Sequence, residues 1–197
     1  MKIKVSILIL IAVSNQAYSQ ISANSQTSLL GYFWAKEFSK EVSLYNAKTF
    51  LVQNILSSEK SVIRFEMDAL VASNSGELTT LVYKCESQKK SGLILGFYGN
   101  RWNDAGVTYQ AYAFKDLPMQ TADSLISVID FAIDNNYKYI DSDADVNNIY
   151  FTFKDISILV FKSFAITKLR VYWNGFDSEW NYNEFKKTKS RLAKKLK

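Results

Sequence analysis

Residues 61–86, SVIRFEMDALVASNSGELTTLVYKCE, contain two strand patterns joined by a turn, and they decide the expected fold. Apolar residues occupy every second position of Ser61–Ala72, namely Ile63, Phe65, Met67, Ala69 and Val71. This alternation is typical of a half-buried strand, because successive side chains of a strand point to opposite faces. Ser, Asn and Gly at 73–76 favour a turn. Glu77–Glu86 then returns, so the stretch predicts an antiparallel hairpin.

The same reasoning extends the hairpin in both directions along the chain. Further strands are expected at Phe50–Leu56, Leu93–Tyr98, Thr108–Leu117, Asn148–Phe153, Ile156–Ser163 and Leu169–Trp173. Helices are expected from Thr27 or Ser28 to about Val42, from Thr121 to about Asn135–Asn136, and over Tyr182–Lys197. This order predicts an α+β fold: an antiparallel β-sheet meander of about seven to eight strands with two to three helices packed on one face.

The first residues of the chain have the pattern of a cleavable signal peptide. Lys2 and Lys4 precede an apolar run over Val5–Val13, and Ala17-Tyr18-Ser19 offers small residues before Gln20. The run is too short to span a bilayer. We therefore expect a signal peptide over 1–19, a single domain over 20–197 and a secreted or periplasmic protein. A buried N-terminal strand is the alternative.

The histidine and cysteine content excludes several chemistries. The chain has no histidine, which excludes His-based acid/base catalysis, Ser-His-Asp and Cys-His nucleophiles, and nearly all zinc and copper sites. Its single cysteine, Cys85, cannot form an intramolecular disulfide. Because Cys85 ends an apolar strand pattern, we expect a buried thiol, with an intermolecular disulfide as the alternative.

Positive charge is concentrated at the C-terminus. The formal net charge of the chain is +5, and Lys186–Lys197 alone holds seven basic residues and no acidic one. The tail could contact an anionic surface, such as lipid or lipopolysaccharide, or it could be the solvated face of a helix. It lacks interleaved aromatic residues, so we expect no nucleic-acid partner.

Two aromatic and polar clusters are the candidate binding sites. The candidate binding residues are Tyr98, Arg101, Trp102, Asp104 and Tyr112 in the first cluster, and Trp173, Trp180 and Tyr182 in the second. Flat rings beside amides and charges suit a protein or glycan ligand. We expect Trp102 and Trp180 to face solvent, because their neighbours are polar. The alternative is that the rings close the ends of the core.

An Asp-rich stretch offers a candidate metal site. Oxygen ligands recur at alternate positions, namely Asp141, Asp143, Asp145 and Asn147, which is the spacing of a calcium loop. Val146 replaces the glycine, and Thr152 replaces the closing glutamate, of an EF-hand. We expect at most weak calcium binding, in the range of about 0.1–1 mM, and no other cofactor. A solvated loop is the alternative.

Carboxylates give the competing, catalytic hypothesis. Glu66 and Asp68 lie on one face of the first strand with Arg64, where they could form a glycosidase-like pair or an ordinary charged face with Lys84 as cross-strand partner. The sequence therefore predicts an exported small binding or interaction domain without catalytic activity, whose ligand is a glycan, a peptide or an envelope component. A carboxylate-based hydrolase acting on polysaccharide, using these residues or the loop acids Asp104 and Asp177, is the alternative. A structural role in the envelope is the third possibility.

Overall fold

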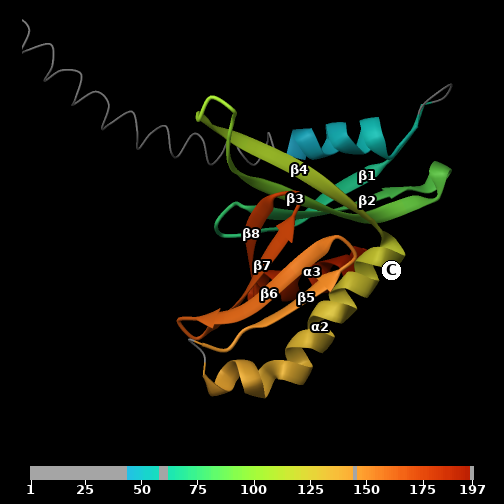
Figure 1. Ribbon diagram of the computed structural model, residues 1–197. Helices are drawn as coiled ribbons and strands as arrows, with labels where there is room; N and C mark the ends of the chain where they lie inside the picture. Colours follow the sequence, from blue (N-terminus) through green and yellow to red (C-terminus); the bar gives the residue numbers. More distant parts are fainter. Residues whose placement is uncertain (1–43, 58–61, 144–145, 196–197) are drawn as a thin grey trace, which may run out of the picture. The chain divides into compact units, whose positions relative to one another are not determined.

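In the part of the chain that the structure describes, eight strands form two antiparallel sheets, each a meander of four strands in sequence order (Figure 1). The first sheet contains β1 (Glu66–Ala72), β2 (Leu78–Cys85), β3 (Lys90–Trp102) and β4 (Thr108–Pro118). The second contains β5 (Ile149–Phe153), β6 (Ile156–Ser163), β7 (Ile166–Trp173) and β8 (Phe176–Asn181). Helix α2 (Met119–Ser142) connects the sheets, α3 (Tyr182–Lys195) follows the second, and a 3-10 turn, η1 (Glu86–Gln88), joins β2 to β3. The predicted α+β class is confirmed, although the strands divide between two sheets.

The computed structural model describes residues 44–57, 62–143 and 146–195. The chain divides into two units, Met1–Asn46 and Ala47–Lys197, and the two sheets belong to the second. The predicted signal peptide and the helix expected after Thr27 lie outside the described residues.

The main core lies between the two sheets and the helices α2 and α3. From β3, alternate residues such as Leu93, Leu95 and Phe97 are buried on the inner face of the first sheet. The Phe97 ring lies 5.2 Å from that of Trp173 and 6.2 Å from that of Phe176, which both belong to the second sheet. Burial of this many apolar side chains is the main term that stabilises the fold.

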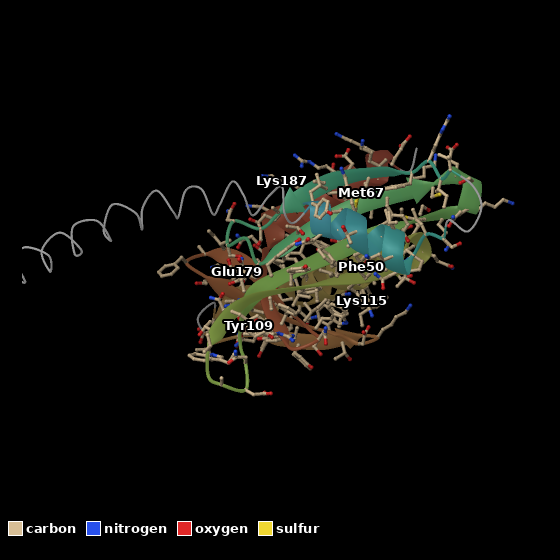
Figure 2. The ribbon with its side chains drawn as sticks, turned by 90° about the horizontal axis from the view of Figure 1, so that it is seen from above. Phe50, Met67, Tyr109, Lys115, Glu179 and Lys187 are labelled. Carbon is tan, nitrogen blue, oxygen red and sulfur yellow. The ribbon has the colours of Figure 1, made fainter. Side chains whose placement is uncertain are left out.

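A helix runs over residues 44–54, and its part within the second unit, residues 47–54, covers some of the outer face of the first sheet (Figure 1). Ala47 and Leu51, one turn apart, are fully buried, and the Phe50 ring lies 5.5 Å from that of Phe114 in β4. Figure 2 shows Phe50 on this helix where it crosses the sheet. The predicted strand over Phe50–Leu56 is therefore wrong. A short apolar run fits either element, and the 3.6-residue repeat of buried positions favours the helix.

Strand β1 departs from the predicted alternation at a β-bulge. The pairing with β2 shifts between Ala69 and Val71, which leaves Leu70 as the extra residue of β1. An extra residue in one strand reverses the face to which the following side chains point. Val71 lies opposite Thr80, whereas Met67 and Ala69 lie opposite Tyr83 and Leu81, so the prediction that Val71 shares a face with Met67 and Ala69 is wrong.

Helix α2 is longer than predicted at both ends. It begins at Met119, directly after Pro118, instead of behind an N-cap at Thr121, and it continues past Asn135 to Ser142. The Asn135 side chain donates a hydrogen bond to the Phe131 carbonyl one turn earlier, so it does not end the helix. Ile140 is buried and keeps the last two turns packed.

A strand was missed at Phe176–Asn181, which the sequence assigned to a loop. Asn174 and Gly175 both have positive φ and form a two-residue turn, after which β8 pairs with β7. Phe176, Ser178 and Trp180 alternate inward, but the polar residues between them hide this period in the sequence. The other expected hairpins and α3 are confirmed in kind, with Phe185 and Leu192 of α3 buried.

The Cys85 thiol is buried, as predicted. In the part of the chain that the structure describes, no helix has both the length and the apolar character needed to cross a membrane.

Candidate functional site

The distal half of the β3–β4 hairpin presents a patterned face. Residues that stand directly opposite each other in an antiparallel pair project to the same side of the sheet. Three such pairs follow one another along the hairpin: Tyr98 with Tyr112, Asn100 with Gln110, and Trp102 with Thr108. We call these six residues the ribbon face. It lies on the outer face of the first sheet, next to Phe114, which the helix 44–54 covers.

Most of the ribbon face is open to solvent. Trp102 is 74% exposed and Tyr112 is 53% exposed, and Asn100, Thr108 and Gln110 are also exposed. Tyr98 is half-buried, with its ring 6.4 Å from that of Tyr112. None of the six side chains carries a formal charge at neutral pH. The face therefore combines aromatic rings with primary amides and hydroxyls.

The turn at the end of the hairpin is ordered by its own hydrogen bonds. The Asn103 side-chain oxygen accepts hydrogen bonds from the backbone N–H of Ala105 at 3.0 Å and of Val107 at 2.8 Å. Gly106 has a φ of +72°, a left-handed conformation that glycine adopts without strain. These bonds fix the ends of the two strands that carry Trp102 and Thr108. Asp104 is exposed in this turn.

Arg101 fastens the opposite face of the hairpin to the second sheet. Its guanidinium group lies 4.2 Å from the centre of the Phe176 ring and donates a hydrogen bond to the Asn174 carbonyl. A cation over an aromatic face is an attractive arrangement. Tyr109, directly opposite Arg101, is 47% exposed on that face and lies near the start of β4 (Figure 2). Arg101 of the first cluster therefore contacts the turn between β7 and β8, which directly follows Trp173 of the second cluster.

The second cluster faces the interior. Trp180 is only 2% exposed and packs edge-on against Phe185, so the expectation that it faces solvent is wrong. Its polar neighbours alternate outward from β8 while Trp180 points into the core. Trp173 is half-buried and its indole N–H donates to Asp155 at 2.8 Å. Tyr182 stacks on Phe185. The expected exposure of Trp102 is confirmed.

The candidate calcium ligands lie where α2 ends. Asp141 is in the last turn of the helix and forms an ion pair with Lys162. Asp143 follows the helix, and its carbonyl accepts the Asn147 N–H at 2.8 Å. Asp145 lies outside the described residues. Among the residues that the structure describes, no group of three acidic, cysteine or histidine side chains is placed to hold a metal ion.

Glu66 and Asp68 lie on β1 and have separate surroundings. Lys84 is the cross-strand partner of Glu66, as predicted, whereas Asp68 forms an ion pair with Lys195 of α3 at 2.6 Å. A cavity of about 600 Å³ is present beside Glu66 and is lined by Val62, Arg64, Phe65, Glu66, Lys84, Glu86 and Ser87. Its second carboxylate, Glu86, accepts a hydrogen bond from Lys84, which lowers the pKa of Glu86.

Helix α3 uses part of its positive charge for internal contacts. Lys189 pairs with Asp130 of α2, and Arg191 donates to the Leu70 carbonyl of β1. Lys187, labelled in Figure 2, and Lys194 are exposed. The cationic surface of α3 is therefore smaller than the count of basic residues implies.

The sequence missed three members of the ribbon face as candidate site residues, namely Asn100, Thr108 and Gln110. Their signal was present, because the alternation of polar residues in β3 and β4 continues to the end of the hairpin. Comparison of the chain with protein families, with curated proteins and with solved structures finds no match. The residues of this chain are therefore the basis for proposing a function.

Proposed function

We propose that this protein is an exported domain that binds a ligand through the ribbon face and performs no catalysis. The observation that supports the proposal is the solvent exposure of Trp102 and Tyr112 on one face of an ordered hairpin. Large aromatic side chains contribute most when they bury their rings, and they are enriched at binding surfaces. Two exposed rings around a row of amides suit recognition.

The hairpin is held in place before a ligand arrives. Arg101 ties its inner face to Asn174 and Phe176, while Asn103 closes the turn. A surface that is already ordered loses less conformational entropy on binding, which favours affinity. This rigidity supports a binding role for the ribbon face.

The alternative, a carboxylate-based hydrolase, has less support. A general acid needs a raised pKa, and a retaining or inverting pair needs two carboxyl groups facing each other across the substrate. Asp68 is paired with Lys195, and Lys84 lowers the pKa of Glu86 beside the cavity. Neither arrangement favours an acid/base pair with Glu66.

Export by the signal pattern of residues 1–19 would place the ribbon face outside the cytoplasm. The basic residues of Lys186–Lys197 would assist at an anionic surface through exposed side chains such as Lys187 and Lys194. Export and the contact with an anionic surface are both part of the proposal, in which the ribbon face binds the ligand.

The test is a thermal-shift screen of the wild type and Trp102→Ala against glycans, peptides, lipopolysaccharide and calcium. A ligand that binds the native state raises the melting temperature by mass action. We expect at least one ligand to stabilise the wild type and not the variant. Ligands that stabilise both proteins equally, or a stable protein partner whose crosslinking is insensitive to Trp102→Ala, would contradict the proposal.

A further inference from the structure

We infer that the ligand of the ribbon face is a neutral oligosaccharide or polysaccharide. This inference rests on the proposed function and names the chemical class of its ligand. It follows from the charge, the hydrogen-bonding groups and the spacing of the side chains on that face.

The polar groups of the face match hydroxyl groups. Asn100 and Gln110 form the middle pair, and each primary amide offers two N–H donors and one carbonyl acceptor. The hydroxyl of Thr108 can donate and accept, and so can that of Tyr112. A sugar hydroxyl also donates and accepts, so a polyol can satisfy these groups in both directions.

The aromatic groups match the faces of sugar rings. The π-face of an aromatic ring is negative, so it attracts the weakly positive C–H groups that line one side of a pyranose. The pairs Tyr98–Tyr112 and Trp102–Thr108 lie on either side of the amide pair. Because a strand rises about 3.3 Å per residue, the four steps along the strand from Tyr98 to Trp102 span roughly 13 Å. This length suits several linked sugars.

Other ligand classes fit this face less well. Single-stranded nucleic acids and anionic glycans need cations beside the rings, but the ribbon face has none. The adjacent cation, Arg101, points to the other side of the hairpin and is committed to Asn174 and Phe176. A peptide added to a sheet pairs with a strand edge, whereas these groups project from the face.

The chain provides a matched control for the test. Tyr109 is an exposed aromatic residue of the same hairpin, but it lies opposite Arg101 on the other face. Trp102→Ala and Gln110→Ala remove groups from the ribbon face, and Tyr109→Ala removes an exposed ring outside it. All three side chains are exposed, so the variants should fold, which the melting temperature of each checks.

Affinity is measured for neutral soluble polysaccharides (glucan, mannan, xylan), for an anionic polyuronate and for a library of uncharged peptides. We expect at least one neutral polysaccharide to bind. Its affinity should fall about tenfold or more in Trp102→Ala, because the contribution of stacking on an aromatic ring corresponds to a change of this size. Gln110→Ala should weaken binding severalfold, and Tyr109→Ala should leave it within about twofold. Binding should not change between low and high salt, because no ion pair forms.

The possible outcomes distinguish a failure of the neutral-glycan inference from a failure of the proposed binding function. If only the peptides or the polyuronate bind, and Trp102→Ala abolishes this binding, the inference of a neutral glycan is overturned while the proposed function stands. If a neutral polysaccharide binds equally to the wild type and to Trp102→Ala, the ribbon face is not the site and both are overturned.

Discussion

The Tyr83 hydroxyl of β2 donates a hydrogen bond of 2.9 Å to the Asp116 carboxylate of β4, reaching across β3. Gly92 of β3 lies directly opposite Tyr83, and a Cβ atom there would stand 2.8 Å from the Tyr83 ring. Because Gly92 has no side chain, the Tyr83 side chain can cross β3 at this position and reach Asp116 in β4.

Gly92→Ala is expected to destabilise the fold by about 1–3 kcal/mol, the usual cost of overpacking. The new methyl group would lie 2.6 Å from the Leu117 carbonyl oxygen, which is backbone and cannot rotate away. Gly99→Ala, on the same strand, meets only Phe176 at 3.7 Å and is the control. Urea denaturation of both variants measures the free energy of unfolding, and equal values for both would refute the steric account.

We expect the contribution of Asp116 to the free energy of unfolding to decrease as the pH rises. Burial raises the pKa of Asp116 in the native state, although the Tyr83 hydrogen bond and the neighbouring lysines oppose this. The unfolded chain then loses its proton first, so stability is lost as pH increases from about 4, the ordinary value of an aspartate, through the raised value.

Asp116→Asn keeps an acceptor for Tyr83 and removes the titration. The free energy of unfolding of this variant, relative to the wild type, should rise between pH 3 and pH 7. Urea denaturation across this range measures the difference. A constant difference over the whole range would show that Asp116 has the same pKa in the folded and unfolded states.

Glu184 is a buried carboxylate that stabilises the start of α3. It accepts hydrogen bonds from the backbone N–H of Asn181, three residues earlier, at 3.1 Å and of Asn74 in the β1–β2 turn at 2.9 Å. We expect Glu184→Ala to lower the free energy of unfolding by about 2 kcal/mol, because a helix cap is lost and two backbone donors lose their buried acceptor. Chemical denaturation tests this value. Glu86→Ala, at an exposed ion pair, should leave the stability unchanged.

Phe164 stands in a strained turn. Phe164 and Ala165, with φ of 50° and 61°, form the two-residue connection between β6 and β7, where Asn and Gly are usually found. The Phe164 side chain is 93% exposed, so it contributes little packing. Phe164→Asn should stabilise the fold by roughly 1 kcal/mol by relieving the left-handed strain. Thermal unfolding measures the gain, and Phe164→Leu should show none.

Trp102 and Trp180 should differ sharply when truncated. Trp180 is almost fully buried against Phe185, so Trp180→Ala should cost about 3–5 kcal/mol. Trp102→Ala removes an exposed ring and should change stability by less than about 0.5 kcal/mol. Parallel urea titrations of the two variants test this contrast, and a large loss in Trp102→Ala would show that its ring packs against the fold.

Local patterns predicted the elements whose signal lies within a few residues. The hairpin over β1 and β2, the strands β4, β5 and β6, and the terminal helix follow from alternation, turn chemistry and helical spacing. The helix at 44–54 was missed because a short apolar run fits a strand as well as a helix. The strand β8 was missed because polar residues separate its apolar positions, so that it resembles a loop. In both cases the packing partners decide the element.

The candidate site shows the same division. Trp102 and Tyr112 stood out from the sequence as aromatic residues among polar neighbours, and so did Trp180, which the fold buries. Only the pairing register shows that Asn100 and Gln110 lie between the exposed rings on one face. Residues 100 and 110 are brought together by hydrogen bonds between strands, and sequence spacing does not encode that contact.

By itself, the sequence determined the α+β class, the absence of histidine chemistry and the order of most strands, because these depend on composition and on neighbours along the chain. Tertiary structure alone decided that the strands split into two sheets, that a bulge changes the face of Val71, and that Trp180 is buried while Trp102 is exposed. The reason is physical. Which face of an element is buried depends on the surface packed against it, and that surface comes from residues far away in the chain.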